Sequence, residues 1–255
     1  MDYNKFGDVL ICDATYKTNR FKMPLFIFAG VNHHRSTVVF GCALINDERI
    51  ETYKWVFRIF LHAMGMKKPQ SILTDGDRAM KGAIKYVMPE TRHRLCSWHL
   101  ERNAKGICHQ SGFIRQFNSC MLSSCIVDEF ENKWAELVSK YNLNVDKKDW
   151  VKQMYGMKEN WAEAFFRGTF FAGMTTTQRC EGYHSYIKRF VHVQQRLVDF
   201  VRHFGNSLRR ARNNKDYDDF IASHSEAQLQ THMNSLEKEI EKIYTRTMYM
   251  EVHEI

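Results

Sequence analysis

The sequence predicts an α/β fold, with a β-sheet in the first hundred residues and helices through most of the remainder. Three observations support this prediction. Apolar, β-branched runs occupy residues 8–15, 25–33 and 37–46. The apolar spacing then changes to a helical period, and short apolar runs alternate with helical segments. Beyond residue 111 the pattern is helical and rich in aromatic residues.

The first three runs have the pattern of consecutive strands. The first has four apolar residues, Val9 to Cys12, followed by the carboxylate of Asp13, and "NRFKMP" turns the chain into the second, "LFIFAGVNH". "NHHRS" has the composition of a hairpin turn before the third run, "TVVFGCALIN". Three antiparallel strands are the simplest arrangement of these runs.

Helices and strands alternate after residue 47. Apolar residues of the segment 47–66 share one helical face, and Gly65 and Pro69 end that helix. "SILTD" is a short buried strand ending in Asp75, and "DRAMKGAIKYVM" is a helix. "RHRLC" is a fifth strand that leads into the helical segment "SWHLERNAK". The predicted order is therefore β-β-β-α-β-α-β-α.

The second half of the chain is predicted to be helical. We interpret the aromatic residues between 111 and 174 as a core rather than as a cofactor-binding group. A further helix begins near Thr175 and carries Glu181. The last helix has a short heptad pattern, which fits either pairing with a second chain or docking on the same domain. Its apolar residues are Leu229, Met233, Leu236, Ile240 and Ile243.

Composition indicates a soluble intracellular protein. The 255 residues are 44% hydrophobic and 26% charged, without the roughly 20 successive apolar residues that a membrane helix requires. The N-terminus has no basic-then-apolar signal segment. Seven cysteines, an odd number without scaffold spacing, indicate a reducing compartment rather than a disulfide framework.

Three carboxylates form the candidate catalytic site. Asp13 and Asp75 each close a predicted strand, and they would meet at one sheet edge if the first and fourth strands are neighbours. Glu181, on a later helix, could bring a third carboxylate. Such a group repels itself unless a cation lies between its members, and Mg²⁺ prefers oxygen ligands. The alternative for Asp13 is a turn hydrogen bond, whereas Asp77 is suited to cap the next helix and leaves Asp75 for the metal.

A Cys-x₂-His motif, Cys96 and His99, is a zinc candidate, although two more ligands would be needed and no standard Cys-x₂-Cys partner is present. Local packing beside Trp98 is the alternative interpretation. An exposed Trp98 could instead stack on nucleic-acid bases.

A basic block indicates a polyanionic partner such as DNA. The stretch 188–215 holds eight Lys or Arg residues against a single acid, Asp199, whereas 216–255 has nine acidic residues and three basic ones. A solvated helix face is the alternative interpretation. The candidate DNA-binding residues are Trp98, Lys188, Arg189, Arg196, Arg202, Arg209, Arg210 and Arg212.

Five segments, taken in order, resemble one known family. They are "FGDVLICDATYKTNRFKMPLFIFAGVNHH", "TYKWVFRIFLHAMG", "ILTDGDRAMKGAI", "TRHRLCSWHLERNA" and "FFAGMTTTQRCEGYHSYIKRFVH". Together they resemble the Mutator-like element (MULE) transposase domain of the plant far-red impaired response and far-red elongated hypocotyl proteins. The resemblance covers almost the entire chain, so we expect residues 1–255 to be one such domain.

The resemblance implies an RNase H-like core at about 7–110 and 175–192, a helical insertion at about 111–174 and C-terminal helices at about 193–250. Complete members also carry an N-terminal zinc-binding DNA-recognition domain and a C-terminal SWIM-type zinc finger. Neither pattern occurs here. We therefore expect the central portion of a longer protein, or a truncated copy, with Zn²⁺ belonging to the missing modules.

Residue by residue, the resemblance implies an ancestral catalytic triad of Asp13, Asp75 and Glu181, with Mg²⁺ or Mn²⁺ as cofactor. The family's Cys-x₂-His motif falls on Cys96 and His99. After the third acid, Gly182 and His184 depart from the "SExxN"-like pattern that the family often carries, and Cys180 precedes that acid.

Three functional hypotheses follow. The favoured one is a domesticated transposase domain of a nuclear DNA-binding transcriptional regulator of light signalling or development, for which homo- or heterodimerisation with family members is one option. The second is an active Mg²⁺-dependent transposase that cuts and joins DNA. The third is a protein-interaction scaffold with a vestigial acidic site. Sequence leaves open whether catalysis is retained.

Overall fold

The computed structural model describes residues 2–14, 23–123, 125–188 and 196–224, with isolated positions 239, 244, 245 and 248. The side chains of Asp146, Ile187 and Lys188 are outside this description. The five apolar residues of the predicted C-terminal heptad, Leu229, Met233, Leu236, Ile240 and Ile243, also lie outside the described residues.

The predicted α/β class and the order of the N-terminal elements are confirmed, after one additional short helix, α1 (Asp2–Phe6). The five strands form a mixed sheet with the order β3-β2-β1-β4-β5. The bounds of the strands are β1 Val9–Ala14, β2 Leu25–Val31, β3 Thr37–Leu44, β4 Ser71–Thr74 and β5 Arg92–Leu95. The three helices that alternate with the last two strands are α2 Ile50–Ala63, α3 Arg78–Val87 and α4 Ser97–Lys105.

The remaining described elements are helical. The helix predicted near Thr175 begins at Gln178 and follows a segment with turns at Gly168 and Gly173, both of which have positive φ. The bounds are α5 Phe113–Leu122, α6 Val127–Lys140, α7 Leu143–Asp146, α8 Lys148–Gly156, η1 Lys158–Asn160, η2 Glu163–Phe165, α9 Gln178–Lys188 and α10 Leu197–His224. In this described part, no helix is long and apolar enough to cross a membrane.

The chain divides into two compact units. The first comprises Met1–Gly7, Ala14–Asp47 and Arg179–Ile255, and the second comprises Asp8–Asp13 and Glu48–Gln178. Each unit is described below by itself.

In the first unit, β2 and β3 form the predicted antiparallel hairpin, with Leu25 opposite Leu44 and Val31 opposite Thr37. Helices α9 and α10 meet through Tyr183, whose hydroxyl lies 2.8 Å from the Ser207 hydroxyl and whose ring packs edge-on against Phe204. Ser207 and Phe204 lie on the same face of α10, which is the buried face of that helix.

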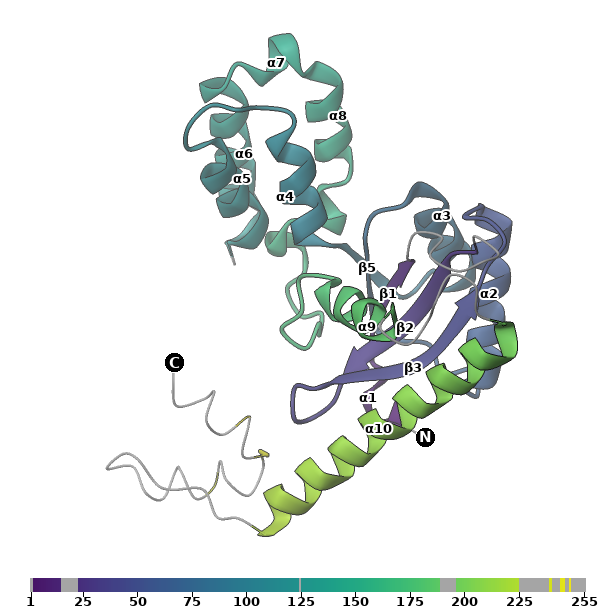
Figure 1. The fold of residues 1–255 in the computed structure, drawn as a ribbon. Helices are drawn as coiled ribbons and strands as arrows, with labels where there is room; N and C mark the ends of the chain where they lie inside the picture. Colours follow the sequence, from purple (N-terminus) through teal and green to yellow (C-terminus); the bar gives the residue numbers. More distant parts are fainter. Residues whose placement is uncertain are drawn as a thin grey trace. The chain divides into compact units, whose positions relative to one another are not determined.

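In the second unit, parallel strands are accompanied by helices. β4 lies between β1 and β5 and pairs in parallel with both. The predicted apolar face of α2 is buried, and α2 packs against α3. In Figure 1, helices α4 to α8 lie together as a group. The aromatic residues of this group form a core, as predicted, with Phe113, Phe117, Phe130 and Trp161 at most 1% exposed.

Candidate active site

Two aspartates lie at the ends of neighbouring parallel strands in the second unit. β1 and β4 pair with Val9 opposite Ser71 and Ile11 opposite Leu73. Continuing this register by two residues places Asp13 opposite Asp75. Asp13 is only 6% exposed, so the apolar first strand does bury the carboxylate that interrupts its sequence. The neighbouring positions of β1 and β4, which the site prediction required, are thus observed.

The turn after β4 fixes the Asp75 carboxylate. Gly76 has a φ of +96°, a conformation that side chains with a Cβ atom rarely adopt. This turn lets the Asp77 amide donate to Asp75 Oδ1 at 3.1 Å. Asp77 in turn caps α3, because its Oδ1 accepts from the Met80 amide at 2.7 Å. The two acids therefore have the separate positions that the sequence predicted.

A third parallel strand brings the Cys-x₂-His motif to the same edge. Thr74 lies opposite Leu95, and Cys96 follows at once, with its amide donating to the Thr74 carbonyl at 2.8 Å. His99 lies in the first turn of α4. The Cys96 sulfur, 1% exposed, accepts from the Thr177 amide at 3.3 Å and is also hydrogen-bonded to His99.

The charges of this strand-end cluster (Asp13, Asp75, Cys96 and His99) act on one another. Burial raises the pKa of Asp75 and outweighs the opposing effects of the Asp77 amide and His99. The hydrogen bond to Cys96 raises the pKa of His99 against the effect of burial, and the nearby carboxylates of Asp75 and Asp13 add to the rise. Burial disfavours the Cys96 thiolate, but hydrogen bonds from His99 and Thr177 prevail and lower the pKa of its thiol.

A tyrosine that sequence reasoning assigned only to the core also faces this cluster. Tyr53 of α2 is fully buried. Burial raises the pKa of its phenol, and the charges of Glu48, Asp77, Asp75 and Asp13 raise it further. The only signal in the sequence was a hydroxyl-bearing residue on an otherwise apolar helix face, and that signal does not identify a partner.

The cluster fits a divalent cation. Asp13 and Asp75 are acidic oxygen donors at adjacent strand ends, and the carboxylate of Asp75 is disfavoured as an anion by its burial. A bound cation would compensate that cost, because opposite charge favours the ionised carboxylate. The Asp77 amide occupies only one of the several lone-pair positions of Asp75.

The third predicted acid lies in the other unit. Glu181 is partly buried in the first turn of α9, between buried Cys180 and exposed Gly182. His184, one turn further along, is 4% exposed.

Among the described residues, no third ligand lies close enough to Cys96 and His99 to complete the predicted zinc site. Across the described ranges, one group has three or more His, Cys, Asp or Glu ligand atoms within 4.8 Å of one another, and that group does not include this pair. The hydrogen bond between the two side chains accounts for their proximity. This favours the local-packing interpretation.

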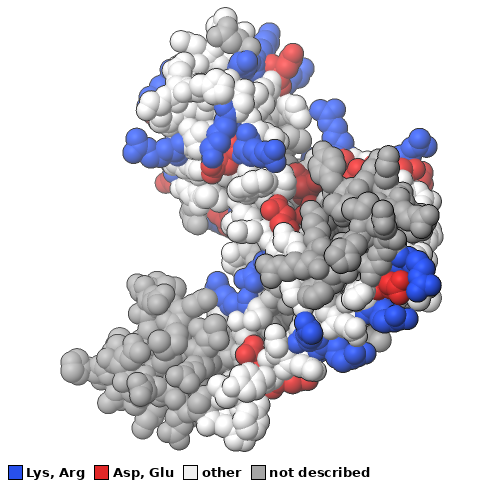
Figure 2. All heavy atoms as spheres, viewed as in Figure 1, with Lys and Arg blue, Asp and Glu red and all other residues white. Residues whose placement is uncertain are grey.

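The predicted DNA-binding arginines are exposed on α10. Arg202 and Arg209, seven residues apart, lie on the side of the helix opposite Phe200 and Phe204. Arg212 is also exposed, but it borders the space between α10 and β3 and forms an ion pair with Asp2. Arg196 and Arg210 are also exposed. Figure 2 shows Lys and Arg side chains along the part of the surface formed by the N-terminal half of α10 and acidic side chains toward its other end.

The other predicted DNA-binding residues are Lys188, Arg189 and Trp98. Arg189 lies outside the described residues, as does the side chain of Lys188. Trp98, in the second unit, is 47% exposed and contacts His99 edge-on with ring centroids 4.8 Å apart. Arg102 lies over the Trp98 ring, 5.5 Å from its centroid.

Comparisons with known proteins agree on one family. A family model described as the MULE transposase domain matches residues 9–103. Protein FAR-RED IMPAIRED RESPONSE 1 of Arabidopsis thaliana is 34% identical over 253 residues, which cover 97% of this chain and 30% of that protein. These matches support a FAR1-like MULE assignment for the chain. The resemblance seen in the five sequence segments is thereby confirmed.

Two further members of the FAR1-like family from the same plant show a similar relation. Protein FAR1-RELATED SEQUENCE 5 is 32% identical over 259 residues, covering 100% of this chain and 32% of that protein. Protein FAR1-RELATED SEQUENCE 4 is 33% identical over 253 residues, covering 97% of this chain and 34% of that protein. The chain thus spans about a third of the length of these relatives.

The MULE match includes most of the candidate site of this FAR1-like domain. It begins at Val9 and ends at residue 103, so Asp13, Asp75, Cys96 and His99 all lie within it. Glu181 lies beyond it. The chain is therefore a transposase-derived domain whose matched part carries the strand-end cluster.

Proposed function

We propose that this chain is the transposase-derived domain of a plant nuclear transcriptional regulator and that it binds DNA through the basic face of α10. The single observation on which this rests is the row of exposed arginines opposite the buried face of that helix, in a chain of FAR1-like ancestry. Light signalling or development is the process that this ancestry favours. Dimerisation with family members stays a prediction.

The chemistry of the basic face favours recognition without base specificity. Arginine guanidinium groups donate to phosphate oxygens, and such contacts position a protein on DNA but do not read its sequence. Arg202 and Arg209 lie two helical turns apart and can contact successive phosphates along one strand. Trp98 would add stacking on an unpaired base, which is tolerant of sequence.

Salt dependence of DNA binding tests this proposal. We would measure the affinity of the chain for a labelled duplex over a series of salt concentrations and repeat it with Arg202→Ala, Arg209→Ala and Arg212→Ala combined. Each lost phosphate contact lowers the slope of log affinity against log salt by about 0.9, so a decrease of roughly 2 to 3 is expected.

A matched triple variant controls for general loss of positive charge. Arg115, Lys148 and Lys152 are exposed on helices of the second unit, and their replacement by alanine removes the same charge. An unchanged slope in the α10 variant, or equal losses in both triple variants, would rule out the α10 face as the DNA-binding site.

A second candidate function is supported by the strand-end cluster. Three consecutive strands followed by two parallel ones, with aspartates at the ends of β1 and β4, are what we expect of an RNase H-like nuclease core. We propose Asp13, Asp75 and Glu181 as its Mg²⁺ or Mn²⁺ ligands. Two such ions about 3.5–4 Å apart activate an attacking oxygen and stabilise the leaving oxygen of a phosphodiester.

Residues of the chain itself would prepare this site. The Asp77 amide orients the Asp75 carboxylate, and the charge of Asp75 contributes to the raised pKa of buried Tyr53. The pKa of His99 is raised by its hydrogen bond to Cys96 and by the charges of the two aspartates.

Nicking and strand transfer on terminal-inverted-repeat DNA separate the candidate functions. The assay would compare wild type with Asp75→Asn, and with Glu90→Gln as the control, because the Glu90 side chain is 84% exposed. Mg²⁺- or Mn²⁺-dependent cutting that Asp75→Asn abolishes supports the transposase. DNA binding without cutting by folded wild type supports the regulator, and the absence of both supports the interaction scaffold.

A further inference from the structure

The tip of the β2–β3 hairpin brings two adjacent histidines onto one carboxylate of α10. The Nε2 atom of His33 lies 2.8 Å, and that of His34 2.6 Å, from the same Oδ1 atom of Asp219. All three residues belong to the first unit. Within the described part of the chain, this is the one group of potential metal ligands whose atoms all lie within 4.8 Å of one another.

The turn explains how neighbouring side chains can point the same way. Consecutive residues of a strand face opposite sides, so His33 and His34 converge only because they lie in a tight turn. Asn32 Oδ1 accepts from the amides of His34 and Ser36, both at 2.9 Å, and Arg35 adopts a φ of 57°. The imidazole rings are thereby held with their centroids 4.2 Å apart.

Neighbouring residues orient the His33 ring and the Asp219 carboxylate. The ring of His33 stacks on Phe6 with centroids 5.2 Å apart. Lys215, one helical turn before Asp219, holds the second carboxylate oxygen, Oδ2, at 2.6 Å. Because the ammonium group occupies Oδ2, the oxygen that faces the histidines is Oδ1. Metal ligands are commonly oriented by such outer hydrogen bonds.

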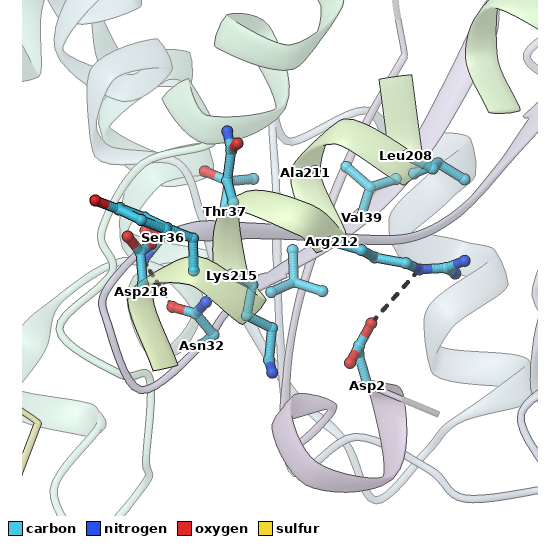
Figure 3. A pocket seen from close by; sticks show the side chains of 13 residues that line it. Asp2, Asn32, Ser36, Thr37, Val39, Leu208, Ala211, Arg212, Lys215 and Asp218 are labelled. Atoms are coloured by element: carbon cyan, nitrogen blue, oxygen red, sulfur yellow. Dashed lines mark hydrogen bonds and ion pairs between the residues drawn. The ribbon is translucent and has the colours of Figure 1, made fainter. Parts of the chain in front are cut away.

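The hairpin and α10 are incompletely packed near this cluster. A cavity of about 330 Å³ lies between β3 and α10 and is lined by Asn32, Ser36, Val39, Leu208, Lys215 and Asp218, among others. Figure 3 shows these side chains with Arg212, which forms an ion pair with Asp2 at 3.8 Å. The His33, His34 and Asp219 contacts lie next to this cavity and join the hairpin tip to the helix.

We propose that His33, His34 and Asp219 form a zinc site that fastens the β2–β3 hairpin to α10. Two imidazole nitrogens and one carboxylate oxygen are a donor set that Zn²⁺ accepts at roughly 2.0–2.2 Å, with water or another ligand completing the tetrahedron. Mg²⁺ prefers oxygen ligands alone, so this site differs in metal from the strand-end cluster.

Solvent can reach the site from one side. The His34 side chain is 4% exposed, whereas those of His33 and Asp219 are 40% and 37% exposed. The ion therefore has an entry path and a place for a fourth ligand. The competing arrangement is metal-free, with both imidazoles and the Lys215 ammonium donating to the carboxylate, and the experiment must distinguish the two.

Metal titration of the full chain tests the proposal. Protein freed of metal with a chelator would be titrated with ZnCl₂ while binding and thermal unfolding are followed. We expect one tight equivalent and a rise in Tm. His34→Gln and Asp219→Asn should each weaken binding by at least roughly tenfold, since even outer-shell changes cost about 10–100-fold.

Two matched controls keep the result specific. Asp216→Asn makes the same chemical change on the same helix at a side chain that is 76% exposed, and His62→Gln removes an exposed histidine from α2. Both should bind zinc as wild type does. If circular dichroism shows that Asp219→Asn or His34→Gln does not fold, His33→Gln replaces it, because that ligand is the most exposed of the three.

Cobalt substitution separates this site from the cysteines. Co²⁺ in a site of two imidazoles and a carboxylate gives d–d absorption without thiolate-to-metal charge transfer, and Cys96→Ser should leave that spectrum unchanged. Absence of tight binding, a spectrum that Cys96→Ser abolishes, or full affinity in folded Asp219→Asn would each overturn the proposal and leave the metal-free arrangement.

Discussion

The aromatic core of the helical group and the strand-end cluster lie in the same unit but bury opposite kinds of side chain. Phe117 stacks on Trp161 with centroids 5.7 Å apart, and both side chains are at most 1% exposed. At the ends of β1 and β4, Asp13 is almost equally buried and Asp75 has a pKa raised by burial. Burial of the aromatic rings stabilises the fold, whereas burial of the carboxylates costs free energy.

This contrast shows which region maintains the fold and which is reserved for chemistry. Buried charged side chains, which lower the stability of the fold, are typical of sites where function rather than stability determined the choice of residue. Substitutions in the aromatic core should therefore lower stability. Conservative substitutions at the aspartates should change ion binding while leaving the free energy of unfolding nearly constant or slightly higher.

The largest effect is expected in the aromatic core. Trp161→Ala removes a ring that packs against Phe117, Phe130 and Trp134, and it should lower the free energy of unfolding by about 3–5 kcal/mol. Urea unfolding followed by circular dichroism measures this loss. Trp98→Ala, at a 47% exposed position, is the control and should stay within about 0.5 kcal/mol of wild type. Equal losses in the two variants would contradict the assignment of the core.

The next effect concerns a buried cation that borders both regions. Arg94 of β5 has a 3% exposed side chain that pairs with Glu163 at 2.6 Å and lies over the rings of Phe166 and Phe171. Glu163→Gln leaves that charge without its carboxylate and should cost about 2–3 kcal/mol in urea unfolding. The Glu51 side chain is 74% exposed in its pair with Lys54, so Glu51→Gln should cost no more than about 0.5 kcal/mol. A similar cost for both would show that Arg94 is stabilised without Glu163.

A smaller effect is expected at the turn that positions Asp75. Gly76→Ala places a Cβ atom 3.6 Å from Leu95, which is ordinary contact, so the cost comes from the φ of +96°. We expect a loss of about 1–2 kcal/mol in the free energy of unfolding. Because the same turn orients the Asp75 carboxylate, metal-dependent stabilisation should fall as well. A variant as stable as wild type would show that the turn tolerates a side chain.

The smallest effect in the absence of metal is expected for Asp75→Asn, and it depends on pH. Folding raises the pKa of Asp75, so the folded state holds its proton to higher pH than the unfolded state does. The stability of wild type should therefore decline as pH rises from about 3.9, the ordinary Asp value, through the raised pKa. Asp75→Asn lacks this decline, so its advantage over wild type should grow across that window when unfolding is measured in chelator. A difference between the two proteins that is independent of pH would contradict the raised pKa.

Divalent cations should make wild type more stable than Asp75→Asn, the opposite of the order expected in chelator. With Mg²⁺ or Mn²⁺ present, wild type should gain thermal stability that Asp75→Asn does not gain, because only wild type retains both strand-end carboxylates. Glu90→Gln should respond to the ions as wild type does.

The sequence predicted the sheet and its acidic edge well because both depend on local patterns. The apolar run from Val9 to Cys12 and the short run before Asp75 define strands directly, and parallel pairing then places their ends together. The capping role of Asp77 was also readable, since it lies immediately before a helical period. The RNase H-like assignment and the catalytic triad remain proposals, because Glu181 belongs to a different unit from the two aspartates.

Other features could not be predicted because they depend on residues distant in the sequence. Asp219 lies 185 residues after His34, and nothing in "NHHRS" indicates which carboxylate those imidazoles meet. Tyr53 has the spacing of a core residue, and its relation to Asp75 appears only when α2 is placed beside the strand ends. The amide of Thr177 that contacts Cys96 comes from a loop without periodicity.

The parallel pairing of β1 with β4 has a kinetic consequence. The β2–β3 hairpin joins residues close in sequence and can form locally, but Val9 must find Ser71 across two strands and a helix. Closing so long a loop is entropically unfavourable before contacts compensate for it, and contacts between distant residues slow folding. Because the strand that carries the first aspartate pairs late, substitutions at the buried end of β1 should mainly speed unfolding, whereas substitutions in the β2–β3 hairpin should slow refolding more.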